Sequence, residues 1–346
     1  MQLEESEILK EEKYYKKEKI KYVVLILLSV ISILIMILVS LCNGNYNTSI
    51  DEVFKAIFSG DNPQIYTIVV YSRLPRLLAS IFVGAALAVS GFCYQSLFKN
   101  KMASPDLLGV SSGASVGAVV AILLNCSFVF ISLFSFVGGI FAVIITSFVA
   151  RLFKGVNFSV SLLLSGIVVT GFMNSFVGIA KFVSNDAQLS SITYWLLGGF
   201  NNVKYEQLVV VCPIIFICII LLLLLRWKIV MLQNSDNDAM SHGINVRRVR
   251  IVVVMLATLI TALSVSISGT VGWIGLAIPN LMNLVVKNDS KKSMVLSVLF
   301  GSLFAMCCDL MARTLTSSEI PVGIITGVFG ASIFLIVLIV RRIKNG

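Results

Sequence analysis

Three arginines and one aspartate are the ionisable side chains whose spacing offers specific chemistry. Arg73 and Arg76 lie in the stretch YSRLPRLLAS, at the start of a hydrophobic run that continues to Leu97. Asp309 and Arg313 lie one helical turn apart near the end of another apolar run. A guanidinium stays charged and offers a planar fork of donors that suits carboxylates and phosphates. Because an arginine at the bilayer centre costs about 2.5–3.5 kcal/mol on insertion scales, we expect these residues at a polar end of a span.

Residues for other common chemistries are missing from the sequence. There is no G-x-x-x-x-G-K-[ST] phosphate loop, and the dipeptide Gly-Lys does not occur, so we do not expect the chain to hydrolyse ATP by that route. His242 is the only histidine, and the seven cysteines lie in or beside apolar runs without a C-x-x-C spacing. We therefore expect no metal site, no disulfide framework and no cofactor. No polar cluster typical of a membrane-embedded enzyme is found either.

The composition is that of a membrane protein. Of the 346 residues, 58% are hydrophobic and 13% are charged, and the mean hydropathy is +0.97. A soluble domain carries roughly 25% charged residues. The net charge of +10 could suggest a nucleic-acid partner, but the charges form short clusters between apolar runs, as in the cytoplasmic loops of membrane proteins. We therefore expect a lipid bilayer as the environment and no nucleic acid.

The apolar runs predict an all-α, polytopic fold with about ten transmembrane helices, since a span needs about 20 apolar residues. The second run is too long for a simple crossing, so its outer end should project from the bilayer. The eighth run is short and rich in glycine, which indicates an irregular or broken span. The predicted spans are 22–42, 65–98, 107–125, 128–151, 158–182, 205–227, 249–268, 271–286, 293–313 and 321–340.

The basic residues predict the orientation. If both termini are cytoplasmic, 21 of the 27 Lys and Arg residues lie on the cytoplasmic side, as the positive-inside rule requires. Residues 1–21 then form a charged, frayed cytoplasmic tail, and the apolar run after it is too long for a signal peptide. The outer loop 43–64 should contain a short amphipathic helix with Ser49 as its N-cap and Glu52 three residues later. In the same orientation Arg73, Arg76 and Arg313 lie on the outer side.

Small residues at helical spacing are frequent in VGAALAVSG and LLGVSSGASVGAVVA, and such residues allow close helix packing in lipid. Together with RLPRLLASIFVGAALAVSGFCYQSLFKNKMASPDLLGVSSGASVGA, SGTVGWIGLAIPNLMN and the segment from GSLFAMCCDLMART to GASIFL, they closely resemble the FecCD-type permeases. These are the membrane subunits of ABC importers for iron–siderophores, haem and cobalamin. The resemblance runs from about Tyr22 to Arg342.

The resemblance implies the fold and the partners. It implies a type II ABC importer permease fold in a single transmembrane domain, residues 22–342, in the cell membrane. It also implies two separate ABC ATPase subunits, an extracellular substrate-binding protein and a second permease copy, in a homodimer or a paralogous heterodimer. An iron chelate is the first substrate to expect, with haem and cobalamin as alternatives.

The resemblance also implies roles for particular residues. Arg73, Arg76 and Arg313 correspond to outward arginines that meet glutamates of the binding protein; alternatively, Arg73 and Arg76 bind lipid phosphates and Arg313 pairs with Asp309. Within the cytoplasmic loop 228–248, the coupling helix against the ATPase would contain Asp238, Ala239, Met240 and Gly243; alternatively, this is a solvated basic loop. The fifth and tenth spans would line a channel between two copies, with Ser159, Ser161, Ser165, Asn174 and Ser175 as candidate lining residues on the fifth.

One departure from the family pattern concerns ionisable groups. The family usually has Pro-His-x-x-Arg where this chain has Pro279-Asn280-Leu281-Met282-Asn283. The change affects either contacts to the ATPase or local packing. Two other functions are open from the residues alone: a secondary transporter, which the scarcity of midplane carboxylates disfavours, and a structural membrane subunit.

Overall fold

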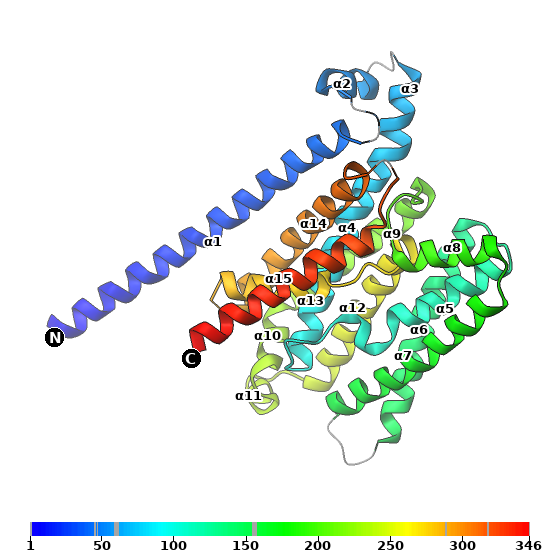
Figure 1. Ribbon diagram of the computed structural model, residues 1–346. Helices are drawn as coiled ribbons and strands as arrows, with labels where there is room; N and C mark the ends of the chain where they lie inside the picture. The colour runs from blue at the N-terminus through cyan, green and yellow to red at the C-terminus, as the bar shows by residue number, and fades with distance from the viewer. Residues whose placement is uncertain are drawn as a thin grey trace.

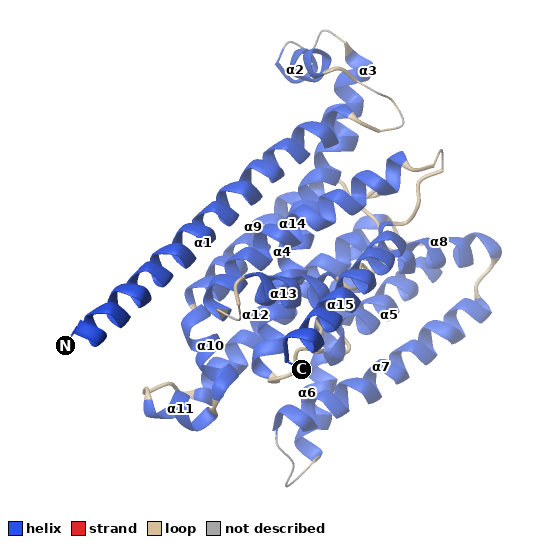
Figure 2. Ribbon diagram, turned by 60° about the vertical axis from the view of Figure 1, so that its left-hand side comes forward, coloured by secondary structure: helices blue, strands red, loops and turns tan. Residues whose placement is uncertain are grey.

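The computed structural model describes residues 2–44, 46, 48–58, 62–153, 158–287, 289–316 and 318–345. The described residues form helices and connecting loops, with no strand among them (Figures 1 and 2). In chain order the elements are α1 (Gln2–Cys42), α2 (Ile50–Phe58), α3 (Pro63–Tyr66), the π-helical η1 (Thr67–Arg73), α4 (Leu74–Leu97), the 3₁₀ turn η2 (Pro105–Leu108), α5 (Val110–Leu123), α6 (Phe128–Leu152), α7 (Phe158–Val183), α8 (Asp186–Leu197), α9 (Tyr205–Leu224), α10 (Arg226–Asn234), α11 (Asp236–Ser241), α12 (Val246–Ser268), α13 (Ile274–Val285), α14 (Ser290–Thr314) and α15 (Val322–Asn345).

The helices confirm the prediction of about ten crossings. Among the described residues, eight helices are long and apolar enough to span a membrane by length and composition. Two shorter apolar helices, α5 and α13, occupy the third and eighth predicted spans. α1 begins at Gln2, so the charged tail is a helical continuation of the first span.

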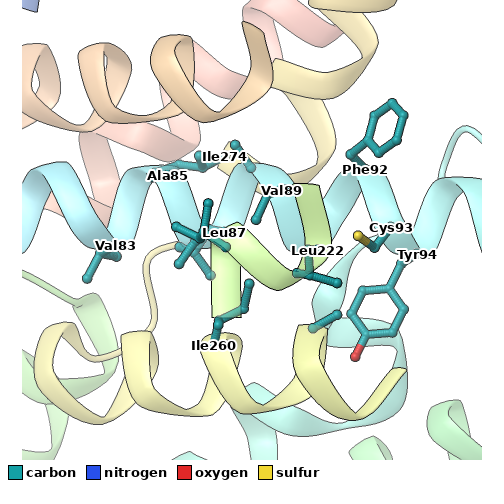
Figure 3. Packing of buried hydrophobic residues seen from close by; sticks show 14 of the residues in the cluster. Val83, Ala85, Leu87, Val89, Phe92, Cys93, Tyr94, Leu222, Ile260 and Ile274 are labelled. Carbon is teal, nitrogen blue, oxygen red and sulfur yellow. The ribbon is translucent and has the colours of Figure 1, made fainter. Parts of the chain in front are cut away.

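Helix α4 runs through the centre of the bundle. Its side chains are buried along almost its whole length, and it packs against α9, α12, α13 and α14. Figure 3 shows Leu222 of α9, Ile260 of α12 and Ile274 of α13 around it. Glycines allow this close approach, because a Cβ at Gly91 would lie 1.9 Å from the carbonyl oxygen of Gly275 on α13. In lipid, such contacts replace the hydrophobic effect as the source of helix association.

Polar side chains inside the bundle bond across helices. The Ser90 and Thr261 hydroxyls lie 2.7 Å apart, and those of Tyr94 and Thr258 lie 2.8 Å apart, which joins α4 to α12 twice. Buried polar groups without partners would be costly. These bonds therefore fix the rotation of α12 against the central helix.

The outer end of the second crossing is longer than a bilayer requires. Pro63–Leu97 is a continuous helical segment of 35 residues, about 50 Å long at 1.5 Å per residue. It widens into the π-helical η1 before Pro75, and the backbone N–H of Leu74 bonds to the carbonyl of Val69. Beside it, α2 has the predicted capping box, with Ser49 N–H 2.8 Å from the Glu52 carboxylate and Glu52 N–H 3.3 Å from the Ser49 hydroxyl.

The eighth crossing is broken, as its glycine content indicated. Between α12 and α13 the chain leaves the helix at Gly269, which has a φ of +65°, and re-enters after Trp273, which has a φ of +68°. The irregular segment is held by a bond from the Thr270 hydroxyl to the carbonyl of Leu196 and by Gly199 N–H, 2.8 Å from the carbonyl of Ser268. These two bonds hold the irregular segment against the end of α8 and the loop that follows it.

Both termini lie at the end of the bundle that holds α10 and α11, opposite α2 and α3 (Figure 1). Lys287 Nζ lies 2.8 Å from the Glu18 carboxylate, which ties the base of α1 to the loop after α13. This arrangement agrees with an even number of crossings. The end with α11 is called the cytoplasmic end below, because the basic loops gather there.

Candidate functional site

At the outer end, Arg76 joins three elements through two carboxylates. Its Nε lies 2.5 Å from Asp309 of α14, and its Nη1 lies 2.8 Å from Glu319 in the loop before α15. Only 7% of Arg76 and 1% of Asp309 is exposed, whereas about a third of the Glu319 side chain is exposed. The ion pair is therefore internal on one side and accessible on the other.

Arg313 shares the same aspartate. Its Nε lies 3.6 Å from Asp309, one turn earlier on α14, which confirms the pairing that the spacing predicted. Its Nη2 also bonds the carbonyl of Ser40, at 2.8 Å, and the Ser40 hydroxyl. Arg313 thus links α14 to the last turn of α1.

Arg73 binds the carboxyl end of α1. Its Nη1 lies 2.5 Å from the carbonyl of Leu41, 3.2 Å from that of Cys42 and 2.8 Å from the hydroxyl of Thr48. Its Nη2 bonds the carbonyl of Tyr46. The last carbonyls of a helix have no partner within it and carry partial negative charge, so a buried cation is favourable there.

The outward arginines are therefore not exposed rim residues. Their exposed fractions are 5% for Arg73, 7% for Arg76 and 5% for Arg313, and all three have partners within the chain. The sequence does not predict this burial, because positive-inside counting gives the side of the membrane but not the exposure of a side chain. A docking role for these residues stays a prediction.

A cavity of about 480 Å³ with both polar and apolar walls lies beside Arg76 at the same end. Arg76 and Glu319 line one wall, and α8 lines another with Ser191, Tyr194 and Trp195. Trp195 is nearly buried, whereas Tyr194 is two-thirds exposed. Sequence reasoning did not single out Glu319, although it is the only acidic residue between the last two predicted spans.

At the cytoplasmic end, α11 is a short helix with both ends capped. The Ser235 hydroxyl accepts from Asn237 N–H at 3.2 Å. At the other end, Gly243 has a φ of +74°, and its N–H bonds the carbonyl of Met240 while Ile244 N–H bonds that of Ala239. This is the Schellman arrangement, in which glycine takes the left-handed position at no steric cost. Among the predicted coupling residues, Ala239 is buried, whereas Asp238 and Met240 point to the surface.

Charged groups fasten α11 to the bundle. The Asp236 carboxylate lies 3.2 Å from Lys99 Nζ and 3.1 Å from Arg250 Nη2. Burial raises the pKa of Asp236, but the hydrogen bonds from Lys99 and Arg250 outweigh it and hold the pKa below its ordinary value. Asp236 is therefore ionised at neutral pH, and α11 is linked to the loop after α4 and to α12.

Asn280 stands where the resembled family usually has histidine, and it serves local packing. It is fully buried, and its Nδ2 donates to the carbonyl of Lys101 at 2.7 Å and to that of Leu276 at 2.9 Å. The neutral amide thus joins α13 to the loop after α4. A contact of this side chain with another protein would need a rearrangement.

The candidate pathway residues of α7 lie on different faces. Ser161 and Ser165 are buried, and their hydroxyls have no hydrogen-bond partner among the described atoms. Asn174 and Ser175 are exposed, on the face with large apolar side chains such as Phe172 and Ile179. These residues therefore do not form one exposed row on α7, and their role in lining a channel stays a prediction. The side chain of Ser159 lies outside the described residues.

Comparisons with known proteins cover all of these sites. The model of the FecCD transport family matches residues 32–341. A probable iron chelatin transport system permease protein of Helicobacter pylori is 37% identical over 279 residues, 80% of this chain and 83% of that protein. The hemin transport system permease protein of Yersinia pestis is 31% identical over 316 residues, 89% of this chain and 95% of that protein. A solved inward-facing ABC transporter of metal-chelate type matches with a TM-score of 0.80 and 28% identity, over 90% of this chain and 97% of that one.

Proposed function

Since the chain belongs to the FecCD transport family of ABC importer permeases, we propose that it carries an iron chelate across the cell membrane. The observation that carries the substrate class is the 37% identity to a relative named for iron chelatin transport. The hemin permease at 31% identity makes haem the alternative, with cobalamin behind it. The chain is a multi-pass membrane subunit and hydrolyses no ATP itself.

Two separate ATPase subunits supply the energy in this proposal, and α11 receives their movement. A short helix can pass on a displacement only if it moves with the bundle as one body. Two capped ends and the ion pairs of Asp236 support this role for α11. Asp238 and Met240 would contact the ATPase, because they are exposed, while Ala239 would hold the helix against its own chain.

A second permease copy would complete the pathway along α7 and α15. Both helices expose large apolar side chains, among them Phe172 on α7 and Val328 on α15. Asn174 and Ser175 lie on the exposed face of α7 and would add polar groups to the pathway.

The outer end would receive the substrate-binding protein through an exchange of carboxylates on Arg76. Glu319 lies in a loop and is partly exposed, so a glutamate of the binding protein could replace it on the Arg76 guanidinium. Asp309 would stay bound throughout, which keeps the buried guanidinium paired. Because Glu319 is partly exposed, we expect the exchange to change the binding free energy within the range of exposed ion pairs, about 0.2–1 kcal/mol.

The exchange predicts the sign of a mutational effect. Glu319→Gln removes the competing carboxylate and should tighten the complex with the binding protein up to about fivefold. The measurement is a titration of the purified permease complex with its binding protein at low and high salt. Asp51→Asn, in the exposed first turn of α2, is the control for charge alone. Unchanged or weaker binding by Glu319→Gln would remove the docking role of Arg76.

Uptake in proteoliposomes tests the function as a whole. The chain, its ATPase and its binding protein should take up a ferric siderophore when ATP is present and a proton or sodium gradient is absent. Gradient-driven uptake without ATP would identify a secondary transporter instead. Accumulation of haem or cobalamin, with the siderophore excluded, would keep the transport mechanism and change the substrate.

A further inference from the structure

A large apolar groove opens at the cytoplasmic end, away from the outer site and from the exposed face of α7. Its volume is about 1650 Å³, and it lies between α6, the start of α7 and α12, with the end of α11 beside it. The side chains that line it are mostly aliphatic or aromatic, including Val143, Phe148, Leu162, Val254 and Met255. We call this cavity the cytoplasmic groove. A surface of this kind suits hydrocarbon rather than a water-soluble ligand.

Three arginines lie at the mouth of the cytoplasmic groove. Arg151 comes from the last turn of α6, whereas Arg247 and Arg250 come from the first turns of α12. No Asp or Glu is among the described residues that line the groove. Arg250 is paired with Asp236, and its Nε is buried without a hydrogen-bond partner among the described groups. Arg151 and Arg247 are exposed, and no ion pair joins either to a carboxylate in the described part of the chain.

We propose that the cytoplasmic groove binds an anionic phospholipid of the inner leaflet. An acyl chain would lie against Val143, Val254 and Met255, and the phosphate would lie between Arg151 and Arg247. The positive charge at the mouth favours an anion, and the apolar walls favour hydrocarbon. A phospholipid has the same arrangement, with an anionic headgroup followed by apolar acyl chains. The cytoplasmic leaflet supplies such lipids, and basic residues near its surface attract them.

The bound lipid would connect α6 with the helix that follows the coupling loop. Arg250 takes part in both places, since it lines the groove and holds Asp236 at the start of α11. The lipid would thus set the position from which α11 moves. This inference does not depend on the substrate, because no residue of the outer site lines the groove.

The headgroup contact can be tested with matched arginine variants. The purified full-length chain in a neutral detergent is titrated with dioleoyl phosphatidylglycerol and with dioleoyl phosphatidylcholine, and bound lipid is counted by native mass spectrometry. Arg247→Gln should weaken phosphatidylglycerol binding about fivefold, as expected for one basic group. Arg248→Gln removes the same charge from the neighbouring exposed residue, which does not line the groove, and should leave the affinity unchanged.

The acyl-chain contact has its own pair of variants. Met255→Trp obstructs the part of the groove where the acyl chain would lie and should abolish the preference for phosphatidylglycerol. Val252→Trp places the same ring on α12 outside the groove and should keep that preference. Glycerol phosphate should not compete, since it lacks the chains. Equal affinities for the two lipids, equal losses from Arg247→Gln and Arg248→Gln, or full competition by glycerol phosphate would each overturn the proposal. So would a Met255→Trp variant that keeps the preference for phosphatidylglycerol.

Discussion

The Asp309 carboxylate balances two guanidiniums in the interior of the outer end. Arg76 hydrogen-bonds it, and Arg313 forms an ion pair with it at 3.6 Å. Arg73 and Arg313 also bond the last carbonyls of α1. Buried ions are costly to desolvate, so such a cluster contributes less to stability than to the choice of one arrangement. Its effect here is to fix α1, α4 and α14 at the end where a binding protein would dock.

Although the intact cluster adds little stability, Asp309→Asn should destabilise the chain strongly, because it leaves buried positive charge unpaired. The change leaves the buried guanidiniums of Arg76 and Arg313 with a single carboxylate, that of the partly exposed Glu319. Removing one partner of a buried ion pair typically costs about 3–5 kcal/mol. The unfolding midpoint of the purified chain in detergent measures the effect. Glu319→Gln removes the partly exposed partner of Arg76 and should cost no more than about 1 kcal/mol. Equal, small effects of both variants would show that Asp309 does not hold the cluster together.

The residues of this cluster differ in how far the sequence predicts them. Asp309 and Arg313 are one turn apart on one helix, so their pairing follows from local geometry. The partners of Arg73 are backbone carbonyls at the end of α1, about 30 residues earlier. Every residue has such a carbonyl, so no side-chain pattern marks this contact. Glu319 lies in the loop between α14 and α15, and it reaches Arg76 only because α14 packs beside α4.

At the scale of helices, glycines allow particular pairs of transmembrane helices to pack with their backbones in contact. Gly84 on α4 faces Gly301 on α14, and Gly91 on α4 faces Gly275 on α13. At each of these contacts a Cβ would collide with a backbone oxygen of the neighbouring helix. A backbone oxygen cannot move away as a side chain can, so these positions tolerate no larger residue.

Gly91→Ala tests this argument. The added methyl would lie 1.9 Å from the carbonyl oxygen of Gly275, so α4 and α13 must separate. Overpacking of this kind costs about 1–3 kcal/mol. Gly178→Ala, on the exposed face of α7 with nothing within 4 Å of the new Cβ, should leave the unfolding midpoint unchanged or slightly raised. An unchanged midpoint for Gly91→Ala would mean that the two helices are not packed this closely.

Span positions were predictable because the bilayer sets a minimum apolar length, and the irregularity of the eighth span was predictable because glycine weakens a helix. The sequence did not predict which face of each helix is buried and which is exposed. On α7, Ser161 is buried and Asn174 is exposed, although both are polar residues on an apolar helix. In lipid the outside of a bundle is as apolar as its interior, so hydrophobicity does not tell the two faces apart.

For the whole molecule, the charge distribution and the fold lead to one orientation. The basic loops, both termini and α11 lie at one end, and α2 and α3 lie at the other (Figures 1 and 2). The arginine cluster, which consists of Arg73, Arg76 and Arg313 around Asp309, lies at the same end as α3, because Arg73 and Arg76 closely follow α3 in the chain. The charge distribution and the packing of the helices are independent observations, and both give the same orientation. The number of crossings is even only if α13, which has 12 residues, is counted as a crossing.

Labelling from each side of the membrane tests this orientation. Ser191→Cys, in the outer cavity on α8, should react with a membrane-impermeant maleimide in intact cells. Ser241→Cys, exposed at the end of α11, should react only after the membrane is opened, because the positive-inside rule places α11 in the cytoplasm. The native chain with its seven cysteines gives the background. Reaction of Ser241→Cys in intact cells, with Ser191→Cys protected, would invert the molecule and move the arginine cluster to the cytoplasmic side.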